Sequence, residues 1–292
     1  MTNLEKYSIL EDIRFIKEAK KLSNSALAEV LNIGEATLYR YLKKPSSITL
    51  ESLNKIYDYA YDNGLRLNTI KSNIFEEEYE KKGYKIMYHG SHDGMIGNKV
   101  ELKYSSVHND FGEGFYCGDS MLQPETFVIN YDNSSLYIFA FNPSKLNKVE
   151  FKVDNEWVLA IAYYRGYLNK YKNNKTITKI IDKINKADYI VAPIADNTMF
   201  DIIERFTKGE LSDEQCQHCL SATNLGKQYV FKSNKALNSL EFLNKCFISS
   251  SERKDLSKTL SDNKTISENK VNIAISKYRT KGISIEELLN EK

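Results

Sequence analysis

Residues 110–118 read DFGEGFYCG, a stretch that places three glycines among aromatic and sulfur-containing side chains. A packed core has little use for this mixture, because glycine offers no side chain to bury. Glycines instead allow strained turns and close backbone approach, and aromatic rings offer flat faces. We therefore interpret Phe111, Phe115 and Tyr116, together with the glycines around them, as a surface on which a planar ligand stacks.

A second motif, MYHGS, lies upstream at residues 87–91. Tyr88 and His89 end a run of strand-forming residues, and Gly90 and Ser91 follow at once. An imidazole beside a glycine turn can donate a hydrogen bond to a ligand hydroxyl or carbonyl. A lone histidine at the end of a strand more often satisfies its own bonds within the fold, so His89 gains weight only from the motifs around it.

The pattern around these motifs alternates between short strands and helices. Runs rich in Tyr, Phe, Ile and Val predict strands, whereas EWVLAIAYYRGYL (156–168) and TMFDIIERF (198–206) predict helices. This mixture predicts an α+β domain over residues 84–247. The polar segment 248–292 predicts a helical tail, which would pack on that domain, form a dimer or stay mobile until a partner binds.

The N-terminal part, residues 1–70, predicts helices only. Its segment LAEVLNIGEATLYRYLK (27–43) combines a short helix, a tight turn in which Gly34 is free to take a positive φ, and a second helix. This order resembles helix-turn-helix domains of the Cro and lambda-repressor kind, which usually act as homodimers. Residues 71–83 form a charged connector to the next domain.

The resemblance implies that residues 35–42 are the recognition helix. It makes six residues candidates for contact with DNA bases or phosphates: Glu35, Thr37, Tyr39, Arg40, Lys43 and Lys44. The charges of this region nearly cancel, which gives weak phosphate neutralisation and weak binding in salt. A helical module that binds only protein therefore stays open as the alternative to binding of operator DNA.

Composition excludes several other classes of function. The net charge of +2 gives no global attraction to nucleic acid or membrane, and no apolar run reaches the ~20 residues that span a bilayer. The charged N-terminus does not resemble a secretory signal, so we expect a cytoplasmic protein. Cys216 and Cys219 have metal-like spacing in CQHC, but no second pair completes a tetrahedral site, and we expect reduced thiols and no metal.

Five motifs occur in a characteristic order: YHGS (88–91), DFGEGFYCG (110–118), EWVLAIAYYRG (156–166), DYIVAPIADNTMF (188–200) and GKQYVFKSNKALNSLEF (226–242). Together they resemble a bacterial family of the ADP-ribosyltransferase superfamily, over residues 86–243. The resemblance implies two split antiparallel β-sheets with flanking helices. It also implies that NAD binds in the cleft between the sheets.

The resemblance also implies roles for individual residues. His89 contacts the adenosine ribose, the backbone at Gly90 holds the nicotinamide amide, and Tyr116 stacks on nicotinamide while Gly112 and Gly114 let the loop curl over the dinucleotide. Gln228 stands where such enzymes normally carry a carboxylate, so another acid is needed. Asp196 is the first candidate, although Asp196 or Asn197 would equally cap the following helix, and Asp110 is the second.

The implied sets of residues are as follows. The catalytic set is His89, Tyr116, Gln228 and Asp196, and the NAD-binding set is Tyr88, His89, Gly90, Ser91, Asp110, Phe111, Gly112, Gly114, Phe115, Tyr116 and Asn197. Arg165 is a weaker candidate for phosphate contact.

The sequence thus predicts a mono-ADP-ribosyltransferase that uses NAD to modify a protein or nucleic acid. Fusion to a helix-turn-helix resembles toxins of toxin–antitoxin or phage-defence loci, which implies an antitoxin protein as a partner. The missing carboxylate favours one alternative, a non-catalytic transcriptional regulator that senses NAD or ADP-ribose. An NAD glycohydrolase is the other alternative.

Overall fold

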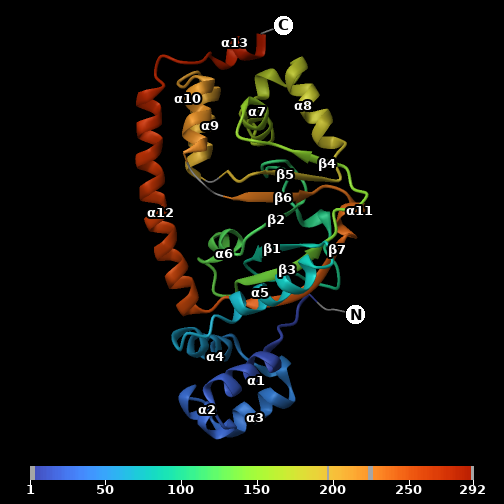
Figure 1. Ribbon diagram of the computed structural model, residues 1–292, viewed down its shortest axis with the longest axis vertical. Helices are drawn as coiled ribbons and strands as arrows, with labels where there is room; N and C mark the ends of the chain where they lie inside the picture. The colour runs from blue at the N-terminus through green and yellow to red at the C-terminus, as the bar shows by residue number, and fades with distance from the viewer. Residues whose placement is uncertain (1–3, 196, 223–225, 291–292) are drawn as a thin grey trace. The chain divides into compact units, whose positions relative to one another are not determined.

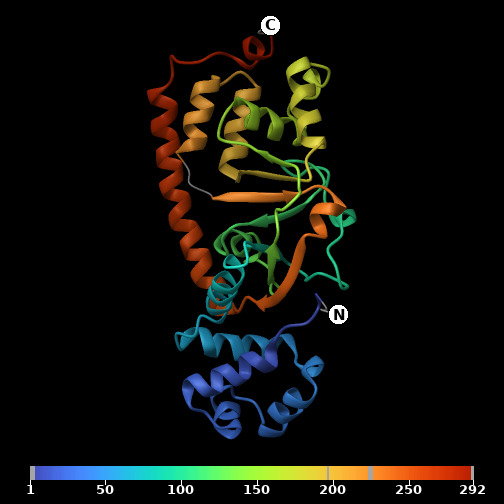
Figure 2. The ribbon, with the colours of Figure 1, turned by 45° about the vertical axis from the view of Figure 1, so that its right-hand side comes forward.

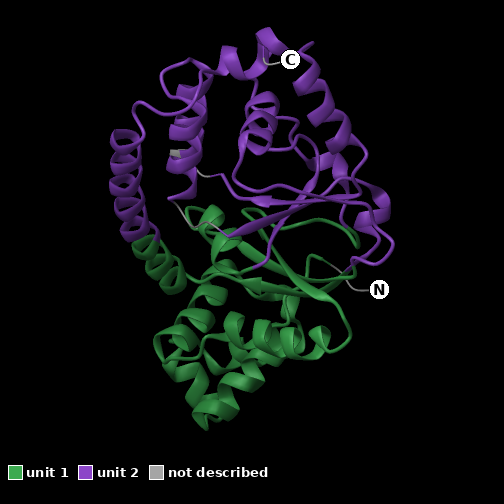
Figure 3. Ribbon diagram, turned by 45° about the horizontal axis from the view of Figure 1, so that its top comes forward, with its two compact units in different colours: residues 1–99, 120–142, 241–259 green, residues 100–119, 143–240, 260–292 purple. Residues whose placement is uncertain are grey.

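The computed structural model describes residues 4–195, 197–222 and 226–290. The chain forms two compact units, each built from helices and strands (Figure 3). Unit 1 comprises residues 1–99, 120–142 and 241–259, and unit 2 comprises residues 100–119, 143–240 and 260–292. The α+β class is confirmed. The division differs from the expected boundaries, because residues 84–247 are shared between both units and the N-terminal helices belong to unit 1.

The N-terminal helices of unit 1 are α1 (Ile9–Lys20), α2 (Asn24–Val30), α3 (Glu35–Lys43), the 3-10 turn η1 (Pro45–Ser47), α4 (Leu50–Asp62) and α5 (Leu67–Glu80) (Figure 1). Side-chain oxygens of Ser23 and Thr49 cap α2 and α4. Gly34 does not use its freedom to take a positive φ: it has φ −66°, and Asn32 takes the left-handed conformation at φ +50°. Asparagine tolerates that region well among residues that carry a side chain.

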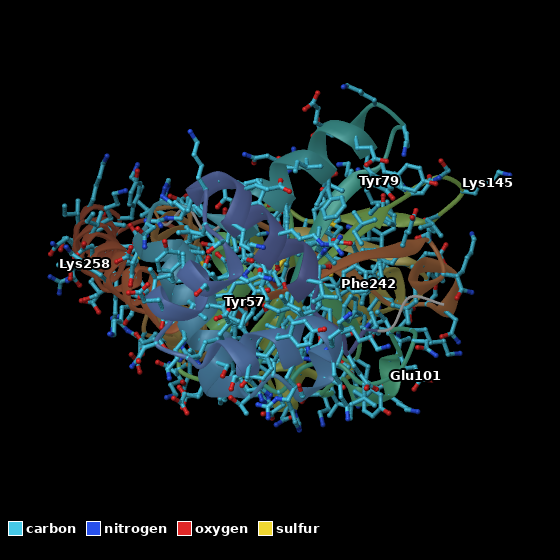
Figure 4. The ribbon with its side chains drawn as sticks, turned by 90° about the horizontal axis from the view of Figure 1, so that it is seen from below. Tyr57, Tyr79, Glu101, Lys145, Phe242 and Lys258 are labelled. Atoms are coloured by element: carbon cyan, nitrogen blue, oxygen red, sulfur yellow. The ribbon has the colours of Figure 1, made fainter. Side chains whose placement is uncertain are left out.

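The core of these helices contains a ring from far along the chain. Phe247 is fully buried among Ile13, Ile16 and Ile56, and its centroid lies 5.3 Å from that of Tyr57, which Figure 4 labels. Phe247 ends strand β7 (Leu240–Phe247). The helix-turn-helix region therefore shares its core with the strands of unit 1 and is not a separate body on a flexible tether.

The strands of unit 1 are β1 (Lys85–Ser91), β3 (Ser135–Phe141) and β7, with β3 between the other two. Strands β1 and β3 are antiparallel, with His89 opposite Tyr137. Side chains alternate between faces, so Tyr88 lies on the face covered by α5 and α6 (Leu122–Val128), and His89 lies on the other. The segment 71–83, expected as a connector, largely continues α5 and packs on β1.

Unit 2 contains four strands in the order β4 (Lys148–Glu150), β5 (Tyr189–Pro193), β6 (Lys227–Phe231) and β2 (Phe115–Gly118). Strands β4 and β5 are parallel, and the other neighbours are antiparallel. Four helices gather on one side of these strands: α7 (Asn155–Tyr164), α8 (Lys175–Asn185), α9 (Asn197–Thr207) and α10 (Asp213–Ser221) (Figures 1 and 2). Short helical turns complete the unit at Leu102–Tyr104 (η2), Asn169–Tyr171 (η3) and Asn234–Leu237 (α11).

The polar tail forms one long helix, α12 (Ser250–Lys277), and a short one, α13 (Ile285–Asn290). The later part of α12 packs on α10 in unit 2, where Gln215 Nε2 donates to the Ile275 carbonyl at 2.9 Å and His218 stacks on Tyr278 with centroids 3.6 Å apart. Of the three expectations for the tail, packing on the rest of the chain is the one observed. Within the described residues, no helix has the length and apolar character needed to cross a membrane.

Candidate functional site

Helix α3 presents one polar face to solvent. Leu38 and Tyr41 are buried against the other helices, and the Tyr41 hydroxyl lies 2.9 Å from that of Ser52, which ties α3 to α4. Five of the six residues predicted to contact DNA are exposed, and Thr37 is half-buried. The exposed ones are Glu35, Tyr39, Arg40, Lys43 and Lys44.

The cations of this face are available to a ligand. The Lys43 ammonium lies 5.6 Å from the Tyr39 ring centroid, and the Arg40 guanidinium lies 5.2 Å from that of Tyr41. In the part of the chain that the structure describes, neither cation forms an ion pair with a carboxylate. Tyr39 is 61% exposed. An exposed aromatic ring beside unpaired cations suits a polyanionic partner.

In unit 2, the loop at residues 110–118 is packed more tightly than expected. Phe111 is fully buried, with its centroid 5.4 Å from that of Phe151, and Phe115 is buried beside Phe231. Both rings contribute to the interior of unit 2, whereas the sequence interpretation expects them to face a ligand.

The glycines of the loop are explained by the same packing. Gly112 has φ +70°, and a Cβ there would lie 2.7 Å from a Tyr164 ring carbon. A Cβ on Gly114 would lie 2.6 Å from Val230 Cγ1. Both positions exclude a larger side chain because of neighbours within unit 2. The glycines let the loop pack against α7 and β6.

Tyr116 is half-buried and ties the loop together. Its hydroxyl donates to the Gly112 carbonyl at 2.7 Å and accepts from the Phe111 amide at 3.1 Å, and burial raises its pKa. Lys232 adds a second tie, because its ammonium donates to the carbonyls of Phe111 at 2.6 Å and Glu113 at 2.5 Å. Burial lowers the Lys232 pKa to about 8. Sequence reasoning missed Lys232, whose only signal is its place directly after β6.

The first residue of the loop, Asp110, lies in a polar cluster with Arg165 and Gln228. Asp110 is 6% exposed, and its Oδ1 accepts from Arg165 Nε at 3.1 Å and Nη2 at 2.5 Å. Its Oδ2 accepts from Gln228 Nε2 at 3.0 Å. The Arg165 guanidinium also lies 4.0 Å from the Phe200 ring centroid. Arg165, directly after α7, and Gln228 on β6 thus donate to one carboxylate, and Phe200 on α9 packs against the guanidinium.

Family comparisons place both candidate sites in known sequence families. Residues 85–242, more than half of the chain, match the family described as protein of unknown function (DUF3990). The chain belongs to the DUF3990 family. Residues 13–59 match the Cro/C1-type helix-turn-helix DNA-binding domain, which confirms the prediction for the N-terminus. No curated protein and no solved structure matches the chain.

The DUF3990 region contains every predicted NAD-site residue, and they fall in different places. Asp110, Phe111, Gly112, Tyr116 and Gln228 come together in unit 2. The predicted residues on β1 belong to unit 1. Asp196 lies outside the described residues, and Asn197 begins α9 without a described side chain.

On β1, the YHGS motif (88–91) places its side chains on both faces of the strand. Tyr88, predicted to contact NAD, is buried, and its hydroxyl donates to Glu76 Oε1 on α5 at 2.5 Å. Gly90 allows the close approach of α6, because a Cβ there would lie 2.2 Å from the Pro124 carbonyl oxygen. His89 lies on the opposite face, with its ring centroid 6.4 Å from that of Tyr137. Tyr137 in turn lies 6.2 Å from Phe242, labelled in Figure 4.

The cysteines of the DUF3990 region show no metal-site geometry. Cys216 and Cys219 are buried on α10, and burial raises the pKa of both thiols. His218 is engaged in its stack with Tyr278. Among the described residues, no group of three or more His, Cys, Asp or Glu side chains is arranged to hold a metal ion.

Proposed function

We propose that the chain binds operator DNA through α3 and that its DUF3990 region transfers ADP-ribose from NAD to a macromolecule. The DNA-binding part rests on one observation: Tyr39, Arg40 and Lys43 are exposed on one face of the second helix of a matched helix-turn-helix domain. Such a helix lies in the major groove, where arginine can bind guanine through two hydrogen bonds. Lys43 and Lys44 would neutralise phosphates.

Binding to operator DNA can be tested by fluorescence anisotropy. The full chain is titrated into a labelled duplex taken from the region upstream of its own gene, and into a scrambled duplex of equal length. We expect tighter binding to the first duplex and a loss of affinity with salt that reflects the phosphates neutralised. Equal affinity for both duplexes at every salt concentration would refute operator recognition.

The transferase part is supported by the order of the five motifs and by where three of their residues lie. His89 is on β1, which pairs antiparallel with β3, and Tyr116 is on β2, which pairs antiparallel with β6. Gln228 is on β6, opposite Gly118 of β2. His89, Tyr116 and Gln228 lie on strands that form antiparallel pairs, which supports the proposal, whereas the parallel β4–β5 pair and the amide at position 228 depart from what the resemblance implies.

The side chains of the DUF3990 region suit a dinucleotide by their chemistry. When bound, NAD would supply the ADP-ribosyl group, with nicotinamide as the leaving group. The Tyr116 ring is fixed in advance by its bond to Gly112, so stacking would cost little ordering entropy. His89 would donate to a ribose hydroxyl, and Arg165 lies close enough to the loop to meet a phosphate.

The negative potential that such a reaction needs has two possible sources in this chain. Asp110 adjoins Gln228, but its charge is shared with Arg165, so it offers less stabilisation of a developing cation than a free carboxylate. Asp196 is the other acid, on the motif that precedes α9. The comparison of Asp196→Asn with Asp110→Asn in turnover assays separates the two.

The absence of a carboxylate at Gln228 also favours the second candidate function, a regulator that binds NAD or ADP-ribose without turnover. A third, an NAD glycohydrolase, differs only in the acceptor, which would be water. Within the leading proposal, the enzyme is the toxin of a toxin–antitoxin or phage-defence locus, and α3 represses that locus or targets the enzyme to nucleic acid.

One assay distinguishes these functions. The purified chain is incubated with adenylate-labelled NAD and bacterial lysate. Label on protein or nucleic acid supports the transferase, free ADP-ribose supports the glycohydrolase, and binding without either product supports the sensor. His89→Ala and Tyr116→Ala should each reduce turnover at least about 100-fold, because each removes a group proposed to touch NAD. Wild-type turnover in both variants would overturn the assignment of the site.

A further inference from the structure

The amide of Gln228 is held in one orientation by two acceptors. Its Nε2 lies 3.0 Å from Asp110 Oδ2 and 3.0 Å from the carbonyl oxygen of Pro193. A carboxylate and a backbone carbonyl can only accept, so the amide atom facing both must be the nitrogen. A primary amide nitrogen has two hydrogens, and both are used.

The remaining polar atom of Gln228 is therefore an acceptor with spare capacity. Among the described residues, none donates a hydrogen bond to its Oε1. Gln228 is 6% exposed, but its Oε1 is not among the buried side-chain atoms without a partner in the described chain, so this oxygen keeps access to solvent and to a ligand. The side chain is thus set to accept from a hydroxyl or N–H group that is not part of the described chain.

Asp110 is fixed in turn by Arg165. Both Nε and Nη2 of the guanidinium donate to Asp110 Oδ1, which leaves Oδ2 for Gln228. The Phe200 ring beneath the guanidinium restricts where Arg165 can go. With both oxygens engaged, Asp110 is poorly placed to contact a ligand directly.

We propose that Asp110 and the Pro193 carbonyl are positioning groups that hold Gln228 as a hydrogen-bond acceptor for a ligand hydroxyl or N–H. The identity of the ligand as NAD rests on the proposed function, whereas the fixed orientation of the amide does not. This arrangement requires an amide at position 228, whereas the transferases that this region resembles carry a carboxylate there. A glutamate at position 228 would set a charged oxygen 3.0 Å from two acceptors, so Gln228→Glu should damage the site and not improve it.

The test is a four-member cycle of the full chain: wild type, Gln228→Glu, Asp110→Asn, and both together. Gln228→Glu alone places two carboxylates face to face. In Asp110→Asn alone, the new amide oxygen must accept from Arg165. The amide nitrogen then faces Gln228 Nε2, so two donors oppose each other. The double variant restores one donor to one acceptor, because the amide nitrogen introduced by Asp110→Asn can donate to the new carboxylate while the amide oxygen still accepts from Arg165.

We expect each single variant to lower Tm by several degrees and to weaken NAD binding or turnover at least about tenfold. The double variant should recover part of both losses, and only part, because the Pro193 carbonyl still faces an oxygen. Gln217→Glu is the matched control: Gln217 is half-buried in unit 2, and its Nε2 donates to Asn155 Oδ1 at 2.8 Å. Asp110→Asn should not rescue it.

The Tm cycle tests the orientation of the Gln228 amide, and the NAD assays test its role as an acceptor. Additive losses in the double variant, or a Gln228→Glu chain as stable as wild type, overturn the proposed orientation. If the Tm cycle shows rescue but the wild type neither binds nor cleaves NAD, the orientation stands and the transferase proposal fails. If the Tm cycle shows rescue and Gln228→Glu binds and cleaves NAD like the wild type, Gln228 does not serve as the acceptor of that ligand and the proposal is overturned.

Discussion

The α3 face and the Asp110 cluster use polar side chains in opposite ways. On α3, Tyr39, Arg40 and Lys43 are exposed, and in the described chain neither of the two cations has a carboxylate partner. Around Asp110, every named polar side chain already has a partner inside unit 2. The first arrangement suits a charged polymer, and the second would hold its atoms in place before the proposed ligand binds. Disturbing one should alter binding alone, and disturbing the other should alter stability as well.

Gly112→Ala should have the largest effect on stability, because it disturbs the tightly packed loop beside Asp110. The substitution forces a side chain into a left-handed conformation and against the Tyr164 ring, at 2.7 Å. We expect unfolding free energy to fall by about 3 kcal/mol, the sum of backbone strain and overpacking. Urea denaturation of the full chain measures the loss.

Gly209→Ala is the matched control for backbone strain. Gly209 also lies in unit 2 and has φ +77°, but nothing lies within 4 Å of its added Cβ. Its cost should stay near ~1 kcal/mol. Equal costs at the two positions would show that Tyr164 yields easily and that the loop is less tightly packed than its contacts suggest.

The second prediction uses Glu252, a half-buried carboxylate that lacks the arginine partner of Asp110. Glu252, in the first turn of α12, accepts from Asn68 Nδ2 at 3.0 Å, and burial raises its pKa from 4.5 to about 7. A folded pKa above the unfolded one gives stability that is fully present below about pH 4.5 and lost as pH rises to about 7. Glu252→Gln should therefore stabilise the chain by about 2 kcal/mol at about pH 8 and leave stability unchanged at about pH 4.

Paired urea titrations of wild type and Glu252→Gln at the two pH values measure this difference. Glu51→Gln is a control, since Glu51 is an exposed carboxylate paired with Lys55 on α4. It should not stabilise the chain at either pH. A Glu252→Gln variant that is less stable than wild type at the higher pH would mean that the charge is well compensated, as it is at Asp110.

The two regions also differ in how much of them the sequence could predict. The helix-turn-helix follows from local spacing, since Leu27, Leu38 and the cap Ser23 lie within one short segment. Even there, the left-handed residue is Asn32 and not Gly34, because the glycine sits at the start of α3 with ordinary β-region angles. Phe247 in the same core has no local signal at all.

The 110–118 loop depends on partners far along the chain. Tyr164, Arg165, Gln228 and Lys232 reach it only because α7 and β6 pack beside β2. Composition singled out the loop correctly as unusual. It could not show whether Phe111 and Phe115 face a ligand or the interior, because that depends on long-range packing. The glycines satisfy either interpretation in sequence, and only the positions of Tyr164 and Val230 separate them.

The third prediction sharpens the α3 side of the contrast. Arg40→Ala should weaken binding to an operator duplex by about 1–2 kcal/mol with little change in Tm, because Arg40 is exposed and contacts the side chain of its helix neighbour Tyr41. Lys55→Ala is the control, since Lys55 lies on α4 and already pairs with Glu51 at 2.8 Å. Equal effects of both substitutions on DNA affinity would point to diffuse electrostatic attraction in place of recognition by α3.

The smallest expected effect lies where the DNA-binding helices meet α12. Asn54 Oδ1 on α4 accepts from the Ser250 amide at 3.1 Å and the Ser250 hydroxyl at 2.8 Å, and so caps the start of α12 from outside that helix. Asn54→Ala should cost about 1 kcal/mol of unfolding free energy, as loss of a cap does. Because Asn54 lies on α4 and away from the exposed face of α3, DNA affinity should not change.

Asn63→Ala is the control that separates the contact of Asn54 with α12 from its bond within α4. Asn54 Nδ2 donates to the Leu50 carbonyl, and Asn63 Nδ2 donates to the Tyr59 carbonyl. In both cases the acceptor lies four residues earlier in the chain. Of these two asparagines, Asn54 is the one that also contacts α12. The difference in stability between the two variants therefore measures the contact with α12 alone. If Asn54→Ala also lowers DNA affinity while Asn63→Ala does not, the first turn of α12 influences α3 through α4, and the two polar regions are not independent in the way their contacts indicate.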